Sequence, residues 1–212
     1  MSSPKVVSET KREVKHNPPP SFTKTRKHYW LAESSQDLYT EIILSSGIFP
    51  LYISKKAEEK IRNHALRFGD DGMEVMGLLL GEVFEHMGNE YVVVRDVATT
   101  SLEASEVSVR FDKEKMGELF EQMDSAGFDY MVVGWYHSHP GHGCFMSPRD
   151  MDTQKNMFTE GYHCAVVVDP LSSEIEAYTL DGDDYRSIPF TIYWEEYEDP
   201  YGKLKKMRIR KD

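Results

Sequence analysis

Strand and helix signals alternate through the body of this chain, and this alternation constrains its fold more than any other feature. Apolar residues recur at helical spacing after three candidate N-caps, Ser54, Asp112 and Ser147. Short runs rich in β-branched and aromatic residues predict strands over 48–53, 75–84, 91–97, 107–111, 131–139, 165–168, 175–180 and 188–194. Strands and helices mixed in this order imply a layered α/β domain.

The 212 residues divide by composition into three parts. We expect a flexible basic N-terminal extension over 1–40, because this segment is charged and contains Pro18–Pro20. The folded domain is then expected over 41–200, followed by a basic tail over 201–212. The chain has a net charge of −11, and the acidic residues are concentrated between the two basic ends. Because nucleic-acid binding depends on lysine and arginine neutralising phosphates, we expect no nucleic acid as a partner.

The sequence also limits where the protein is expected to work. Its longest apolar runs fall far short of the roughly 20 residues that a membrane-spanning helix requires, so no membrane partner is expected. The N-terminus lacks the apolar region of a secretory signal. Two cysteines, Cys144 and Cys164, are too few for a disulfide-built scaffold. These features favour a cytoplasmic protein.

The most informative segment runs from Gly134 to Asp150 and contains two histidines separated by one residue. Because side chains two positions apart on a strand point the same way, His137 and His139 can direct two imidazoles at one point. Asp150 follows after a loop rich in glycine and proline. Two histidines and one carboxylate form a suitable zinc set that leaves the fourth position open, as in catalytic sites.

Simpler explanations exist for each of these residues. A histidine near a strand end often bonds only to the backbone. Ser147 and Asp150 match a helix start, with serine at the N-cap and an acidic residue three positions later. Cys144 is a possible ligand or nucleophile, but a lone thiol is more often a small buried apolar side chain.

The segment resembles the JAMM motif of MPN-domain metalloproteases, and the similarity extends over about residues 48–182. It includes Met73–Leu78, the segment around His137 and His139, and Ala165–Pro170. The similarity is strongest to the type found in the proteasome lid. The chain has Pro148 where these subunits usually have glycine, and it lacks their long C-terminal helices, which favours a simpler, archaeal version.

The resemblance implies a single MPN domain: an α/β fold with a curved mixed β-sheet flanked by helices, similar to cytidine deaminase. It implies one Zn²⁺ per chain, held by His137, His139 and Asp150, with Glu74 as general base and then acid. Ser147 would donate a hydrogen bond to the oxyanion. The segment 98–110 would bind the extended tail of a modifier, with these candidate contacts: Ser105, Val107, Ser108 and Val109.

The activity implied is removal of ubiquitin or a ubiquitin-like modifier from conjugates, with the proteasome or its ATPase as a candidate partner. A second hydrolase remains open, a metalloprotease that trims the C-terminus of a modifier or sulfur-carrier precursor. A third reading is a non-catalytic MPN scaffold, which is disfavoured because such scaffolds generally lack part of the ligand set. The sequence alone does not separate the two hydrolases, since both substrates present the same glycine-rich tail.

Overall fold

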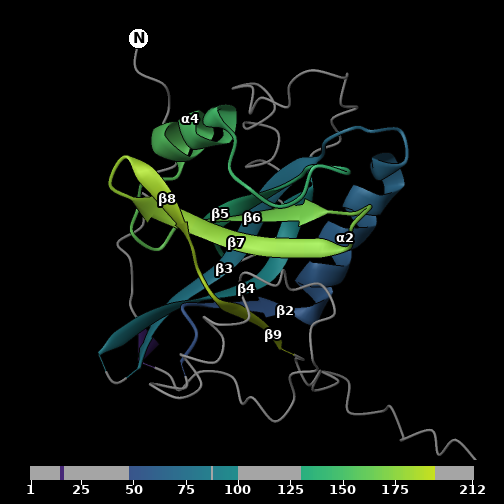
Figure 1. Cartoon of the computed structure of the whole chain (residues 1–212). Helices are drawn as coiled ribbons and strands as arrows, with labels where there is room; N and C mark the ends of the chain where they lie inside the picture. Colours follow the sequence, from purple (N-terminus) through teal and green to yellow (C-terminus); the bar gives the residue numbers. More distant parts are fainter. Residues whose placement is uncertain (1–14, 17–47, 87, 100–129, 194–212) are drawn as a thin grey trace, which may run out of the picture.

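The structure of the chain is a computed structural model that describes residues 15–16, 48–86, 88–99 and 130–193. Within these ranges the main chain forms a mixed sheet and two helices (Figure 1). The helices are α2, Lys55–Gly69, and α4, Pro148–Met157. The strands are β1 Lys15–His16, β2 Leu51–Ser54, β3 Met76–His86, β4 Asn89–Thr99, β5 Met131–Ser138, β6 Cys164–Asp169, β7 Glu174–Asp181, β8 Asp184–Ser187 and β9 Phe190–Tyr193.

The strands form one sheet in the order β8-β7-β6-β5-β3-β4-β2-β9, with β1 paired to β3. The pairs β3–β4, β3–β5, β6–β7 and β7–β8 are antiparallel, whereas β5–β6, β2–β4 and β2–β9 are parallel. The predicted mixed sheet with flanking helices is therefore confirmed. The sheet places β5 beside both β3 and β6, so the segment containing His137 lies at its centre (Figure 1).

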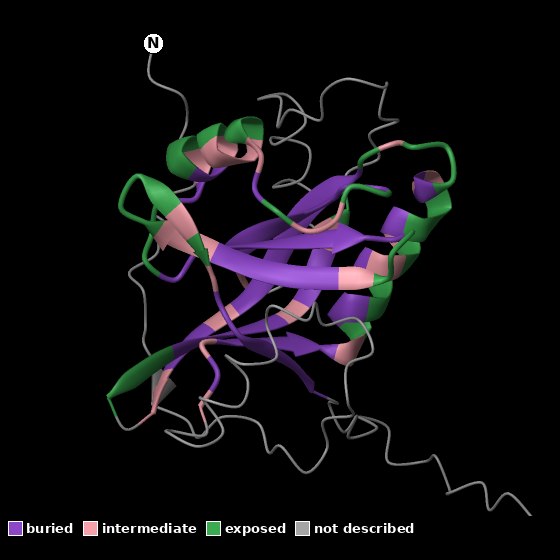
Figure 2. Cartoon of the chain, in the orientation of Figure 1, coloured by how far each residue is buried: buried purple, intermediate pink, exposed green. Residues whose placement is uncertain are grey.

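Each face of the sheet carries its own apolar cluster, because successive strand residues point to opposite faces. On β3, Leu79 belongs to the cluster that packs against α2, whereas Leu78 and Leu80 belong to the opposite cluster. The second cluster is completed by Met146 and Phe158, which flank α4. Strands β2, β5, β6 and β9 are buried along almost their whole length (Figure 2).

Helix α2 begins as the sequence predicts. The Ser54 side chain accepts a hydrogen bond from Ala57 N–H at 3.1 Å, which satisfies one of the free donors of the first turn. Ala57, Ile61 and Ala65 are fully buried against the sheet. Lys56 and Lys60 on α2 each form an ion pair with the carboxylate of Asp96 on β4, and the nitrogen–oxygen distance is 2.6 Å in both pairs.

Most predicted elements among the described residues are present with shifted ends, and two strands, β1 and β8, were not predicted. The strand predicted over 188–194 is present as β9, which begins at Phe190. Strand β8 was not predicted: its four residues contain a single apolar side chain, and it exists because it pairs with the edge strand β7. Strand β1 lies inside the predicted N-terminal extension and pairs with β3 at Phe84.

Several predictions lie outside the described residues. These include the strand at 107–111, the helix after Asp112, and the rest of both terminal segments. Among the helices that the structure does describe, none has the length and apolar character needed to cross a membrane.

We predict that His163, just before β6, makes folding sensitive to mild acid. Its side chain is buried, and desolvation lowers its pKa to about 4 from a usual value near 6.5. The unfolded chain therefore binds a proton first as pH falls, so stability is lost between about pH 6.5 and 4, by up to about 3 kcal/mol. Denaturant unfolding of the wild type and His163→Asn should show a steeper loss below pH 6.5 in the wild type. Parallel pH curves would contradict this assignment.

Candidate metal centre and active site

The strand β5 carries His137 near its end, and His139 follows directly after it. Both imidazoles point to the face of the sheet that α4 covers, as alternation along a strand requires. Only 4% of each of these side chains is exposed. Trp135, two residues earlier on the same face, stacks on His137 with a ring separation of 4.4 Å and an interplanar angle of 16°. The stacking fixes the plane of this imidazole.

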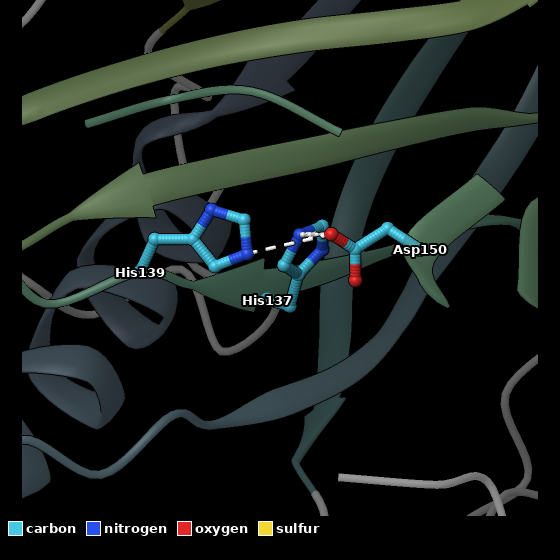
Figure 3. Close-up of side chains that lie close together, drawn as sticks. All are labelled: His137, His139 and Asp150. Carbon is cyan, nitrogen blue, oxygen red and sulfur yellow. Dashed lines mark ion pairs between the residues drawn. The ribbon is translucent and has the colours of Figure 1, made fainter. Parts of the chain in front are cut away.

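Asp150 reaches the two histidines from the first turn of α4. Its Oδ2 atom lies 3.4 Å from Nε2 of His137 and 3.4 Å from Nε2 of His139 (Figure 3). The same oxygen accepts a hydrogen bond from Ser147 N–H at 2.7 Å. In return, the Ser147 hydroxyl accepts one from Asp150 N–H at 3.3 Å. The predicted helix cap is present, and it directs the carboxylate toward the imidazoles.

The geometry of this group suits a metal ion better than direct hydrogen bonds. Ligand atoms 2.0–2.2 Å from a tetrahedral ion lie about 3.4 Å apart, which matches both Nε2–Oδ2 distances. An N–H···O hydrogen bond is usually 2.7–3.2 Å long. Within the described part of the chain, both ring nitrogens of His137 and Nδ1 of His139 are buried without a hydrogen-bond partner. The three side chains can therefore hold a metal ion.

The charge states of the group agree with this role. Burial lowers the pKa of His137, against the opposing effect of the Asp150 carboxylate, so the imidazole stays neutral. Burial would raise the pKa of Asp150, but the two imidazoles and Ser147 hold it well below its usual range. A neutral imidazole and an ionised carboxylate are the forms that bind metals.

A pocket of about 310 Å³ opens beside the three side chains. Glu74 lies on its wall, exposed to solvent just before β3, so the structure brings together all five residues predicted for metal binding and catalysis. The sequence did not predict which other residues line the pocket. The rest of the wall is formed by Val75, Met76, Trp135, His142, Phe145, Pro148, Arg149 and Thr153. The four predicted substrate contacts, at 105 and 107–109, lie outside the described residues.

Cys144 lies near this region but does not line the pocket. Its thiol donates to the carbonyl of Val167 at 3.3 Å, and burial raises its pKa to about 12. A thiol in this state is a poor nucleophile at neutral pH, because the thiolate is the reactive form. The structure thus favours the apolar role for Cys144 over the nucleophilic one.

A residue that sequence reasoning missed holds the loop between His139 and Ser147. The carboxylate of Asp169, at the end of β6, accepts hydrogen bonds from Gly141 N–H and Gly143 N–H, both at 2.8 Å. It also accepts from the N–H groups of Leu171 and Ser172. Gly141 and Gly143 have φ values of +76° and +77°, a region that favours glycine. One buried carboxylate therefore shapes the loop that joins the two halves of the site.

We predict that Asp169→Asn destabilises the protein by about 1.5–3 kcal/mol, because an amide nitrogen would replace a carboxylate oxygen opposite a backbone donor. Denaturant unfolding measures the change. Asp183→Asn is the control: this side chain is fully exposed and should change stability by less than about 0.5 kcal/mol. Equal effects of the two substitutions would contradict the role given to Asp169.

Comparison with known proteins agrees with this geometry. The family model described as JAB1/Mov34/MPN/PAD-1 ubiquitin protease matches residues 50–160. The 26S proteasome regulatory subunit RPN11 of Eremothecium gossypii is 41% identical over 137 residues, covering 63% of this chain and 42% of that protein. Ubiquitin carboxyl-terminal hydrolase RPN11 of Saccharomyces cerevisiae is 42% identical over 126 residues, covering 58% and 39%.

A third relative comes from another assembly. COP9 signalosome complex subunit 5 of Kluyveromyces lactis is 35% identical over 139 residues, covering 65% of this chain and 35% of that protein. The chain thus spans less than half the length of these curated relatives. The solution structure of protein DSY2949 from Desulfitobacterium hafniense matches with a TM-score of 0.52 and 17% identity, covering 70% of this chain and 97% of that one, and it supports the fold alone. The resemblance drawn from the sequence is confirmed: this chain belongs to the JAB1/Mov34/MPN/PAD-1 ubiquitin protease family.

Proposed function

We propose that this protein is a zinc-dependent isopeptidase that removes ubiquitin or a ubiquitin-like modifier from conjugated proteins. The observation that carries the proposal is the position of Asp150 Oδ2, 3.4 Å from Nε2 of both His137 and His139, beside a pocket that Glu74 also lines. The names of the relatives, a ubiquitin hydrolase and subunits of the proteasome and the COP9 signalosome, support the choice of substrate. The proteasome or its ATPase is the proposed partner.

His137, His139 and Asp150 are the proposed ligands of the ion. Two nitrogens and one oxygen suit zinc, and three protein ligands leave one position for water or substrate, as catalytic zinc sites do. When bound, zinc would supply a Lewis acid that polarises a carbonyl oxygen and lowers the pKa of water from 15.7 to about 7.

Glu74 is the proposed general base and acid. It stands between the turn after α2 and the start of β3, where it is exposed to solvent and lines the pocket. In this role its carboxylate takes a proton from the attacking water and later delivers that proton to the departing amine. No covalent intermediate with the protein is required.

Ser147 is the proposed oxyanion donor. Its hydroxyl accepts from Asp150 N–H and lines the pocket. A hydroxyl has one proton to donate in addition to its two acceptor positions, so capping the helix leaves that proton for a substrate oxygen. A donor of this kind typically contributes about 10²–10³-fold to turnover.

The segment 98–110 remains the proposed contact for the modifier's tail, through Ser105, Val107, Ser108 and Val109. An extended tail ending in glycines would suit strand addition, in which the main chain supplies most of the contacts.

The two cysteines are free, and we propose a reducing compartment, the cytoplasm, as the place of action.

We predict that purified protein contains one zinc per chain and cleaves a lysine-linked ubiquitin-like conjugate. A chelator should abolish cleavage and added zinc should restore it, whereas a thiol-directed reagent should leave the rate within about two-fold, because no thiolate attacks the substrate. Metal analysis and a gel-based cleavage assay make these measurements. A linear fusion of the same modifier, assayed beside the conjugate, tests precursor processing: preference for the fusion would overturn the isopeptidase proposal.

We also predict that Glu74→Gln keeps the bound zinc but lowers the cleavage rate by about 10²–10⁴-fold, since the amide cannot accept the proton. Glu59→Gln, an exposed position on α2, is the matched control and should retain full activity. Retained cleavage by Glu74→Gln would remove Glu74 from the mechanism.

A further inference from the structure

Ser138 stands between the two histidines, and its side chain serves a different part of the structure. On a strand, the residue between two that face the same way points to the opposite face. Ser138 is completely buried. Its hydroxyl accepts a hydrogen bond from Val75 N–H at 2.9 Å, and its own N–H donates to the Val75 carbonyl at 2.9 Å. One serine thus holds both polar backbone groups of Val75.

This hydroxyl completes the pairing of β3 with β5 at the point where β3 begins. Met76 is paired with His137, so Val75 and Ser138 are the next pair of the antiparallel ladder. In a regular hydrogen-bonded pair, the two residues exchange two N–H···O=C bonds. Here one of the two is normal, and in the other the serine hydroxyl takes the place of the carbonyl. The opposite edge of the same segment pairs with β6, where Ser138 is matched to Val168.

The two hydrogen bonds between Ser138 and Val75 hold the backbone directly beside Glu74. Upstream, Met73 N–H bonds to the Phe68 carbonyl at 3.2 Å at the end of α2. Downstream, Val75 is bound to Ser138. The backbone is therefore hydrogen-bonded on both sides of Glu74. The partner on the downstream side is Ser138, which lies between the two histidines of the site.

We infer that Ser138 is a positioning residue that fixes Glu74 relative to the proposed metal ligands. This inference rests on the proposed function, because it assigns Ser138 a role in the same reaction. Ser138 is not among the residues that line the pocket, and its hydroxyl acts through the Val75 N–H. Displacement of a catalytic group by about 1 Å can cost about 10²-fold in rate, so a small shift of this backbone suffices.

Removing the hydroxyl is the first test. Ser138→Ala should lower kcat by about 10- to 100-fold and leave KM within about two-fold, since the pocket wall keeps its side chains. Zinc content should stay at one per chain. The visible spectrum of the cobalt-substituted protein, which reports the ligand set, should match that of the wild type. Loss of zinc or an altered cobalt spectrum would overturn the inference, because Ser138 would then act on the ligands.

A pair of variants with the same shape separates the hydrogen bond from packing. Ser138→Thr keeps a hydroxyl and should retain activity near that of the wild type, whereas Ser138→Val, similar in volume, should lose it. Equal activity of the two variants would overturn the inference. Amide hydrogen exchange of the wild type provides a measurement that needs no variant: the Val75 amide should be strongly protected, and rapid exchange at Val75 would overturn the inference.

Combination with Glu74→Gln distinguishes this inference from the proposed function. If Ser138 acts through Glu74, then Ser138→Ala should reduce the residual rate of Glu74→Gln by less than two-fold. A further ten-fold loss would overturn the inference. If Glu74→Gln itself retains full cleavage, the proposed mechanism fails. If Glu74→Gln is inactive but Ser138→Ala keeps the wild-type kcat, only the inference about Ser138 fails.

Discussion

One carboxylate oxygen connects the helix α4 to the centre of the sheet. Oδ2 of Asp150 accepts from Ser147 N–H at the helix start and lies 3.4 Å from an imidazole nitrogen of His137 and of His139. The capping bond orients the carboxylate, and the imidazoles determine where it points. The helix-cap explanation of Ser147 and Asp150 is therefore confirmed, and the same geometry supports the proposed metal-binding role of Asp150.

The surrounding structure keeps these groups in place from several directions. Trp135 stacks on His137 and donates to the buried amide of Gln154 at 2.6 Å, which joins β5 to α4. Asp169 holds the intervening loop from β6. These contacts come from segments far apart in the sequence, and together they hold the side chains of the site in one arrangement.

Sequence reasoning predicted the residues whose signal is local. The spacing of His137 and His139, the cap at Ser147 and the layered α/β class all follow from short-range patterns, whereas Glu74 and the curved mixed sheet came from family resemblance. Ser138 and Asp169 were missed because their partners, Val75 and the glycine loop, become neighbours only in the folded sheet. Strand β8 was missed for a related reason: its polar residues form a strand only beside β7.

We propose that two imidazoles and one carboxylate bind a single zinc ion that keeps one open position. X-ray absorption spectroscopy of the zinc-loaded protein at the zinc edge tests it most directly. We expect four nitrogen or oxygen neighbours at about 2.0–2.2 Å, two of them showing imidazole scattering, and no sulfur. A sulfur neighbour at about 2.3 Å, or a spectrum unchanged by His137→Ala, would contradict it.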